Sequence, residues 1–464
     1  MASPHHGALE LAAQYAEEYL DALDETPVAP TASLEALRAR LCKELADDAL
    51  PAEQVIRELV ADSEGGLVGC AGGRFHAWVM GGSLPAALAA DWLTSAWDQN
   101  AGIYASGPAA ALVEEAAGAW LKDLLNIPAN ASFAFVTGCQ MAHVTCLAAA
   151  RHGVLRRRGW NVEEQGLAGS PPIRILTGSE RHSSVMRAVG LLGLGKRNVV
   201  ELPVDHEGGL PAATLAHELG RNAAMPTIVV LQAGDLNRGL YDRFAELIPI
   251  AKEFDAWVHV DGAFGLWAAA APSLKHLAHG SELADSWATD GHKWLNVPFD
   301  CGYAFVNDRE AHRAAMSIRE SYLVHDSGAR DQIDWNPEWS RRARGFATYA
   351  ALRQLGRRGV AELVERCCAH ARALVEGIGE LPGAEVVAMP VINQGLLRFR
   401  DPEGLDDRAY TDQVIAAVLA SGEAFFGGAD QGGVRCMRVS VSNWITTQAD
   451  VDRTIAAFRR ILAR

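Results

Sequence analysis

The chain has 464 residues, 49% of them hydrophobic and 21% charged, which is too long for one ordinary core and typical of a globular protein with several domains. Its formal net charge of −15 argues against nucleic acid as a partner, because such partners require clustered Lys and Arg. The eight cysteines form no CxxC pair, and the N-terminus shows neither a signal-peptide pattern nor a membrane span. We therefore expect a cytoplasmic protein with reduced thiols and a small-molecule substrate.

Residues 1–74 are predicted to form a helical arm. Helical periodicity covers 7–23, 32–47 and 51–62, with Pro30 and Pro51 between these segments. Such an arm has little core of its own, so we expect it to pack against a partner or a second subunit, and we expect a homodimer.

Residues 75–350 are predicted to form a large α/β domain. Helices are expected at 107–125, 138–158, 182–192, 210–221 and 242–254, and apolar strands at 173–177, 198–203, 226–233, 256–260, 284–288 and 301–306. This alternation indicates a mostly parallel sheet with helices on both faces. Ligands of such a sheet bind at the carboxyl ends of its strands.

Residues 351–464 are predicted to form a small α+β domain. A helix is expected at 359–378, strands near 384–389, 395–399 and 434–441, and a last helix from 448. The basic run SRRARG at 340–345, just before this domain, reads as a helix face that makes ion pairs.

Two polar segments lie where a predicted helix begins. In TGCQMAH (137–143), Gly138 permits close approach and Thr137 and Cys139 add side-chain donors, so the helix start suits a phosphate. Such a junction can equally be a simple turn. In SERHSSV (179–185), His182 could stack on a flat ring, although a lone histidine at this position is usually a capping residue.

Two further segments place ionisable residues at strand ends. Asp261 ends the apolar strand in WVHVDGAFG (257–265), where a buried carboxylate is costly unless a cation meets it. Lys293 follows the next strand, beside His292 and among apolar residues that are unusual around an exposed lysine. A lysine amine in such a setting can capture a carbonyl cofactor as a Schiff base.

Together these features specify one cofactor. A phosphate site, a ring-stacking histidine, a carboxylate for a protonated pyridine nitrogen and a Schiff-base lysine are what pyridoxal phosphate requires. His259 and Asp261 share a strand face, but no third ligand is evident, so no metal is expected.

Three motifs carry a family resemblance. HVDGAFG is similar to an HVDxA motif, DGHKWL to NPHKWL and RHSSV to AHSSV. These are motifs of the group II pyridoxal-phosphate decarboxylases of fold type I, the family of aromatic-L-amino-acid and glutamate decarboxylases. The resemblance runs from about residue 70 to the C-terminus. It implies decarboxylation of an L-amino acid to an amine and carbon dioxide.

The same resemblance implies three further roles. Tyr322, in ESYLVHD, corresponds to a tyrosine of a mobile loop that delivers the proton replacing the lost carboxylate. Ala263 is expected against the cofactor ring face opposite His182. Trp78, in FHAWVMGG, resembles a residue of the substrate pocket and favours an aromatic or bulky apolar side chain.

Two departures from the family keep other reactions open. AGDLNRG (233–239) replaces a GTTxxG pattern, so Leu236 or Asn237 stands where a threonine is expected near the cofactor's phenolic oxygen. Asp290 replaces a phosphate-binding Asn and would repel phosphate unless its contact is mediated. A carbon–carbon lyase, an aldolase or an oxidative deaminase is therefore the alternative, although relatives with oxidative activity tend to carry Phe at the position of Tyr322. A catalytically silent binding protein is the third reading.

Overall fold

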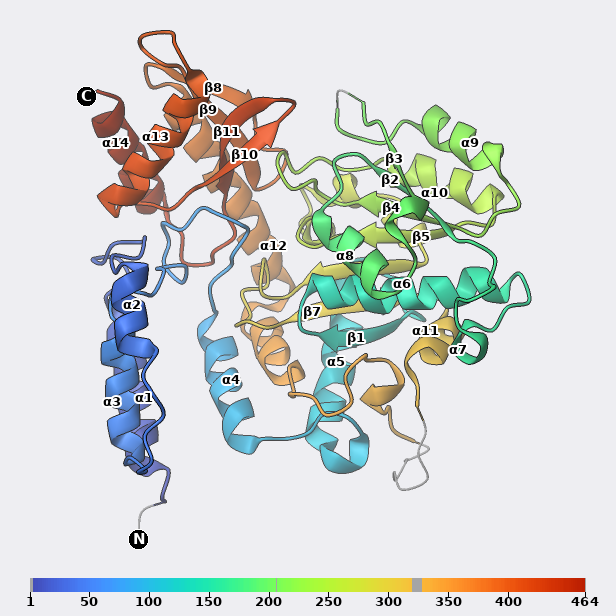
Figure 1. The fold of residues 1–464 in the computed structure, drawn as a ribbon, viewed down its shortest axis with the longest axis horizontal. Coiled ribbons are helices and arrows are strands. Elements are labelled where there is room, and N and C mark those ends of the chain that lie inside the picture. The colour runs from blue at the N-terminus through green and yellow to red at the C-terminus, as the bar shows by residue number, and fades with distance from the viewer. Residues whose placement is uncertain (1–2, 206, 319–327, 464) are drawn as a thin grey trace.

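The computed structural model describes residues 3–205, 207–318 and 328–463, and its largest element is a seven-stranded sheet (Figure 1). Its strands are β1 (Ser132–Val136), β2 (Arg174–Gly178), β3 (Val199–Leu202), β4 (Thr227–Gln232), β5 (Trp257–Asp261), β6 (Ser286–Asp290) and β7 (Gly302–Val306). Their order is β1-β7-β6-β5-β4-β2-β3, and only β7 runs antiparallel to its neighbours. The expected mostly parallel sheet is thus confirmed.

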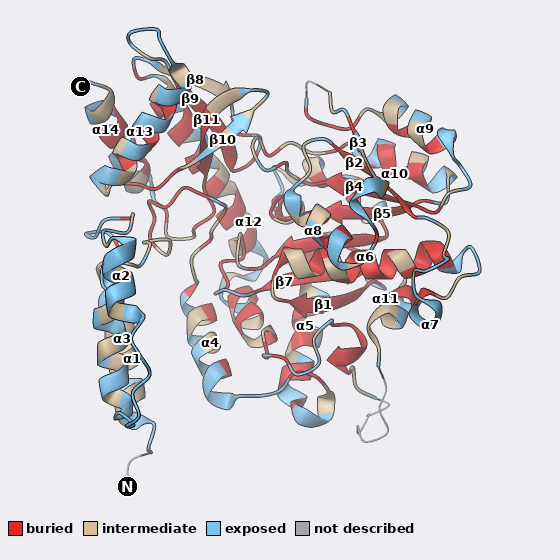
Figure 2. Cartoon of the chain, viewed as in Figure 1, coloured by how far each residue is buried: buried red, intermediate tan, exposed pale blue. Residues whose placement is uncertain are grey.

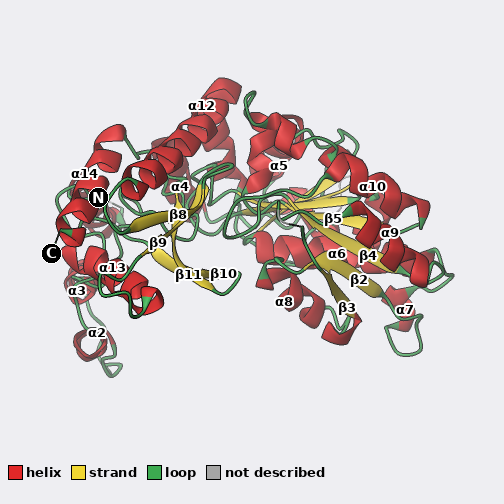
Figure 3. Ribbon diagram, turned by 90° about the horizontal axis from the view of Figure 1, so that it is seen from above, coloured by secondary structure: helices red, strands yellow, loops and turns green. Residues whose placement is uncertain are grey.

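Helices cover both faces of this sheet (Figure 3). One hydrophobic cluster includes residues of α5 (Pro108–Leu124), α9 (Ala212–Arg221) and α10 (Phe244–Glu253). The other includes residues of α6 (Cys139–Arg156), α7 (Val162–Gln165), α8 (Ser183–Leu191) and α11 (Arg309–Met316). Strands β4, β5 and β6 are buried along their length and end in the polar residues Gln232, Asp261 and Asp290, which therefore lie at the carboxyl edge of the sheet.

The N-terminal residues form three helices, α1 (His6–Asp21), α2 (Leu34–Leu41) and α3 (Ala52–Ser63), with no buried residue in any of them. Figure 2 shows them as an exposed column beside the rest of the chain. The predicted helix 32–47 was too long, because α2 ends at Leu41. The next helix, α4 (Pro85–Trp97), was not expected from the sequence.

The C-terminal part has an antiparallel sheet in the order β10-β11-β9-β8. Its strands are β8 (Ala384–Ala388), β9 (Gln394–Phe399), β10 (Gly427–Gln431) and β11 (Val434–Ser440), and its helices are α13 (Asp407–Ser421) and α14 (Gln448–Leu462). Helix α12 (Gly345–Gly379) bends at Gly356, whose φ is 59°, and joins this sheet to the large one. The domain boundaries at 74 and 350 stay predictions.

Among the described residues, none of the helices is long and apolar enough to cross a membrane.

Candidate active site

The polar edge of the large sheet borders a cavity of about 350 Å³. The parallel strands β4, β5 and β6 end here, so the chain that follows each of them meets its neighbours at one place. Five residues expected at a site line the cavity together: Trp78, His182, Asp261, Ala263 and Lys293. This size lies within the range typical of small-ligand pockets.

Lys293 contributes an amine that is already paired. Its Nζ lies 3.0 Å from Oδ2 of Asp290, which is buried, and 5.9 Å from the centre of the Phe264 ring. Burial works to lower the pKa of Lys293, but the Asp290 carboxylate outweighs it and raises the pKa. The amine is therefore held protonated, and it must leave Asp290 before it can act as a nucleophile.

Asp290 occupies the start of α6, where a phosphate was expected. Its Oδ1 accepts a hydrogen bond from the backbone N–H of Cys139 at 2.5 Å and lies 3.5 Å from Nε2 of His292. Gly138, Cys139 and His292 lie around this carboxylate. Neither they nor Thr137 line the cavity. The helix start thus already stabilises one anion.

Asp261 contributes a buried carboxylate at the end of β5. Oδ1 accepts from the backbone N–H of Ala263 at 3.2 Å, and Oδ2 lies 3.5 Å from Nε2 of His143. Burial alone would raise the pKa of Asp261, but the charge and hydrogen bond from His143 outweigh it and hold the pKa below its ordinary value. The carboxylate is ionised and faces the cavity.

His182 is the N-cap of α8, and the structure keeps its ring at the cavity. Its Nδ1 lies 2.7 Å from Oγ of Ser184 and accepts from the Ser184 backbone N–H at 3.2 Å. These bonds leave Nε2 and the ring face available to a ligand. The capping interpretation and the ring-stacking interpretation of His182 are compatible.

The segment that carries Trp78 packs closely on the lysine. A Cβ at Gly81 would lie 1.8 Å from the carbonyl oxygen of Lys293, so only glycine fits there. Trp78 and Val79 both have a positive φ, of 56° and 57°, and the Trp78 side chain is 53% exposed. A strained backbone that presents a large ring to a cavity is a common feature of binding sites.

The sequence missed or left undecided several lining residues, and Arg438 and Leu236 are two of them. Arg438, on β11, is buried and lines the cavity, with Nη1 donating to the Leu236 carbonyl at 3.3 Å. Burial lowers the pKa of its guanidinium. Leu236 itself lines the cavity, whereas Asn237 turns away and donates to Gln431 at 2.9 Å. Arg438 could not be found from spacing, because all the other cavity residues except Gly428 lie far from it in the sequence.

His143 was also missed, and it adds a third potential ligand beside Asp261. Ligand atoms of Cys139, His143 and Asp261 all lie within 4.8 Å of one another. His259, which shares the strand face with Asp261, instead bonds His143 through Nε2 at 2.9 Å. The expectation of no metal stays a prediction.

Tyr322 falls within 319–327, outside the described residues, so its expected role as a proton donor stays a prediction.

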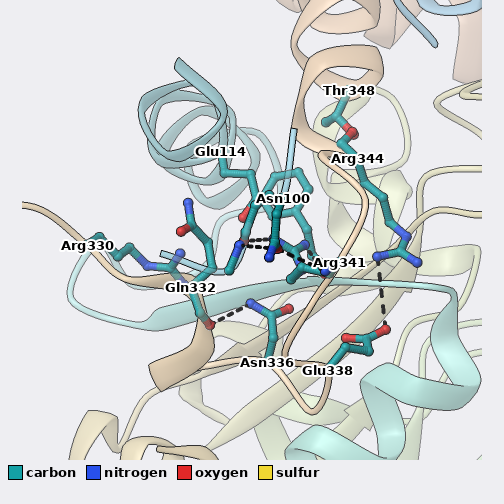
Figure 4. Close-up of polar contacts among 12 residues, drawn as sticks. Asn100, Glu114, Arg330, Gln332, Asn336, Glu338, Arg341, Arg344 and Thr348 are labelled. Atoms are coloured by element: carbon teal, nitrogen blue, oxygen red, sulfur yellow. Dashed lines mark hydrogen bonds and ion pairs between the residues drawn. The ribbon is translucent and has the colours of Figure 1, made fainter. Parts of the chain in front are cut away.

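A second buried polar cluster lies away from the cavity, where the run 340–345 packs on α5 and β1 (Figure 4). Arg341 pairs with Glu114 at 2.6 Å, both side chains being fully buried, and donates to the carbonyls of Ala101 and Phe135. Arg342 and Arg344 pair with Asp91 and Asp300. The run makes ion pairs as expected, but it precedes α12 instead of forming a helix face.

The residues present fit pyridoxal phosphate. Lys293 would offer an amine for its aldehyde, Asp261 would offer a carboxylate for its pyridine nitrogen, and the start of α6, which also bonds Asp290, would offer backbone donors for its phosphate. A mostly parallel α/β sheet with these groups at its strand ends defines the class of the protein, a pyridoxal-phosphate-dependent enzyme of fold type I.

Comparison with known proteins gives the family. The model of the pyridoxal-dependent decarboxylase conserved domain matches residues 35–400, so the chain belongs to this family. It is 27% identical to tryptophan decarboxylase 1 of Oryza sativa subsp. japonica over 87% of the chain and 82% of that protein. It is 24% identical to 4-hydroxyphenylacetaldehyde synthase of Rhodiola rosea, covering 96% of the chain and 92% of the relative.

A solved structure of Oryza sativa TDC with PLP and tryptamine shows the same fold. Its TM-score is 0.91 at 23% identity, and the match covers 98% of each chain. The chain is thus an amino-acid decarboxylase family enzyme that uses pyridoxal phosphate, while its relatives differ in reaction and substrate.

Proposed function

We propose that this enzyme decarboxylates an L-amino acid with an aromatic or bulky apolar side chain, releasing carbon dioxide and the amine. The observation that carries the proposal is that Lys293, Asp261, His182 and Trp78 line one cavity. Bound pyridoxal phosphate supplies an aldehyde that captures amines and a protonated ring that accepts the electron pair left when carbon dioxide departs.

Lys293 is proposed to hold the cofactor covalently and to release it to the substrate amine. Its ammonium must first give up its proton and its pairing with Asp290. Asp261 would hold a proton on the ring nitrogen, and His182 and Ala263, which line the same cavity, would contact the two ring faces. After carbon dioxide leaves, the same carbon must receive one proton, and Tyr322 is the proposed donor.

Arg438 is proposed to bind the substrate carboxylate. Its Nε has no hydrogen-bond partner within the described residues, and a buried guanidinium favours a planar anion. Changing Arg438 to Gln should raise KM for the amino acid about tenfold or more, with little effect on inhibition by the product amine, which lacks the carboxylate. If the variant weakens binding of the amino acid and of the product amine equally, Arg438 instead contacts the side-chain end of the substrate.

Oxidative deamination is the second candidate, because one relative is named 4-hydroxyphenylacetaldehyde synthase. That reaction consumes dioxygen and water and yields an aldehyde, carbon dioxide, ammonia and hydrogen peroxide. An amino-acid panel, assayed with and without oxygen for carbon dioxide, amine and aldehyde, separates the two. One amine per carbon dioxide, independent of oxygen, supports decarboxylation. Aldehyde and peroxide formed only with oxygen would contradict it, and cleavage without carbon dioxide would indicate a carbon–carbon lyase.

A homodimer in the cytoplasm is proposed as the working form. The N-terminal helices and the segment after them expose apolar side chains that a partner copy could cover: Leu9, Leu34, Val55, Leu59 and Leu67. All eight cysteines are unpaired, which suits a reducing compartment. Light scattering of the purified protein should give twice the chain mass of 49.7 kDa, and a monomer of full activity would contradict this.

A further inference from the structure

A row of buried, hydrogen-bonded side chains lies behind Asp261, on the side away from the cavity. His143, on α6, is 3.5 Å from Asp261 through Nε2 and 2.9 Å from Nε2 of His259 through Nδ1. Nδ1 of His259 is in turn 3.0 Å from Oγ of Ser286, on β6. The two histidines and the serine are fully buried, and none of them lines the cavity.

Hydrogen-bond donors at the far end of this row of side chains limit which nitrogen atoms of the two histidines carry protons. The indole Nε1–H of Trp257 can only donate, and it donates to Ser286 Oγ at 2.9 Å. Burial, followed by the nearby His143, lowers the pKa of His259 to about 3, so His259 is neutral and carries one N–H. Either Ser286 donates to His259, or His259 donates to Ser286.

Both arrangements leave an N–H of His143 facing the carboxylate. If Ser286 donates, His259 donates from Nε2 to His143 Nδ1, and a neutral His143 keeps its proton on Nε2. If His259 donates to Ser286, then His143 must supply the proton between the rings. A neutral His143 would then turn a lone pair toward ionised Asp261, so it is protonated on both nitrogens.

We propose that His143 is a positioning residue that keeps Asp261 ionised and aimed at the pyridine nitrogen, and thereby sets the protonation of the cofactor ring. The inference rests on the proposed pairing of Asp261 with that nitrogen. A buried carboxylate is stable only with donors around it, and the backbone N–H of Ala263 is its other close donor. His259 and Ser286 hold the ring of His143 in place, in the same way that hydrogen bonds to the second ring nitrogen orient a metal-binding histidine.

The groups around Asp261 come from several elements. Cys139 and His143 face it from α6, His182 from the start of α8, His259 from its own strand and Lys293 from the segment after β6. Burial raises the pKa of Cys139, so it is a neutral thiol. Of these groups, His143 combines an N–H directed at Asp261 with a buried anchor on its other side.

The test compares His143→Leu with His143→Gln in the holoenzyme. Gln can accept from His259 through its carbonyl and donate to Asp261 through its amide, whereas Leu fills the space without a donor. His152→Leu is the matched control, since His152 is a buried histidine of the same helix whose ring lies 3.6 Å from Glu163. Thermal unfolding confirms that each variant is folded.

Two readouts follow the ring directly: equilibrium dialysis of pyridoxal phosphate and the pH titration of the visible absorbance of the bound cofactor. His143→Leu should weaken binding about tenfold to a hundredfold, as loss of an outer hydrogen-bond partner does. A ring without its proton withdraws fewer electrons from the lysine-linked nitrogen, so the absorbance transition should move up by about one pH unit or more. His143→Gln should restore most of both properties, and His152→Leu should change neither.

Unchanged affinity and titration in a folded His143→Leu variant would overturn the proposal. Equal loss in the Leu and Gln variants would also overturn it, and one zinc atom per subunit in the wild-type protein would then identify His143 as a metal ligand with Cys139 and Asp261. Should His143→Leu not fold, Ser286→Ala removes the far end of the row and should shift the titration in the same direction by a smaller amount. If the titration of Ser286→Ala does not shift at all, the proposal is contradicted. A wild-type protein that binds no pyridoxal phosphate would instead refute the proposed function.

Discussion

Asp261 and Glu114 are both buried carboxylates of the large α/β region, but their surroundings differ. Glu114 meets Arg341 in a cluster formed entirely by the chain (Figure 4). Asp261 has donors behind it and a cavity in front of it, shared with Lys293. The first arrangement links α5, β1 and the segment before α12, whereas the second leaves a carboxylate oriented toward a ligand.

The comparison separates charges that hold the fold from charges that serve the site. Removing one member of a buried ion pair leaves an uncompensated charge and costs stability. Removing a group that faces the cavity should cost binding or catalysis and spare the fold. The predictions below test this separation, beginning with the largest effect.

Replacing Lys293 with Ala should abolish covalent attachment of the cofactor and lower kcat by about a thousandfold or more, because no other described residue of the cavity carries an amine. The free energy of unfolding should change by less than about 1 kcal/mol. Turnover assays measure the loss of kcat, and chemical denaturation measures the free energy of unfolding. Lys275→Ala, at an exposed lysine, is the control, and a variant of Lys293 that keeps its activity would break the comparison.

Replacing Arg341 with Met should lower the free energy of unfolding by about 3–5 kcal/mol, since Glu114 is left buried and unpaired. The folded fraction should bind pyridoxal phosphate as the wild type does. Denaturation curves with and without the cofactor measure both quantities. The double variant Glu114→Leu with Arg341→Met should recover part of the loss, and weaker cofactor binding at unchanged stability would assign this cluster to the site.

Replacing Asp290 with Asn should lower the pKa of Lys293 and tighten cofactor binding by about tenfold, because one negative charge leaves the phosphate end. Only the neutral amine captures an aldehyde. In the wild type the raised pKa means that the rate of capture increases with pH up to the alkaline range, and in the variant this increase should begin at lower pH. Stopped-flow absorbance at a series of pH values shows whether the pH dependence of capture moves to lower pH in the variant. If the pH profile of capture is the same in the variant and the wild type, Asp290 does not set the pKa of Lys293.

Replacing Trp78 with Ala should have the smallest effect, a loss of about twofold to tenfold in kcat/KM for aromatic substrates relative to small ones, which is the contribution of one aromatic pair. Competition between paired substrates measures the ratio directly. Leu112→Ala, at an exposed apolar residue of α5, serves as the control. An equal loss for every substrate would make Trp78 a structural residue.

Much of the fold could be predicted because apolar strands and amphipathic helices alternate clearly from β2 to β7. The expected strand at 284–288 was placed slightly early, since β6 runs from Ser286 to Asp290 and its polar end reads as a loop. Strand β10, with the sequence GGADQ, has poor local strand propensity and depends on its pairing with β11. Helix α4 was missed, and its residues are mostly exposed.

The position of Asp261, which ends an apolar strand, and of Lys293, which follows one, beside the same cavity was predictable from the sequence. His143 was not, because a histidine within a buried helix reads as a core residue and only the fold brings it to β5. Arg438 lies on a strand of the other sheet, so its place at the cavity depends on packing between the two parts of the chain. Asp290 was identified, but its bond to Cys139 at the helix start required the structure.

The central claim is that Lys293 holds pyridoxal phosphate at the cavity formed with Asp261. Borohydride reduction of the holoenzyme fixes the cofactor to its lysine, and mass spectrometry of the digested protein identifies the modified peptide. The account predicts one pyridoxyl group per chain, on Lys293. A label on another lysine, or no label in protein saturated with the cofactor, would contradict it.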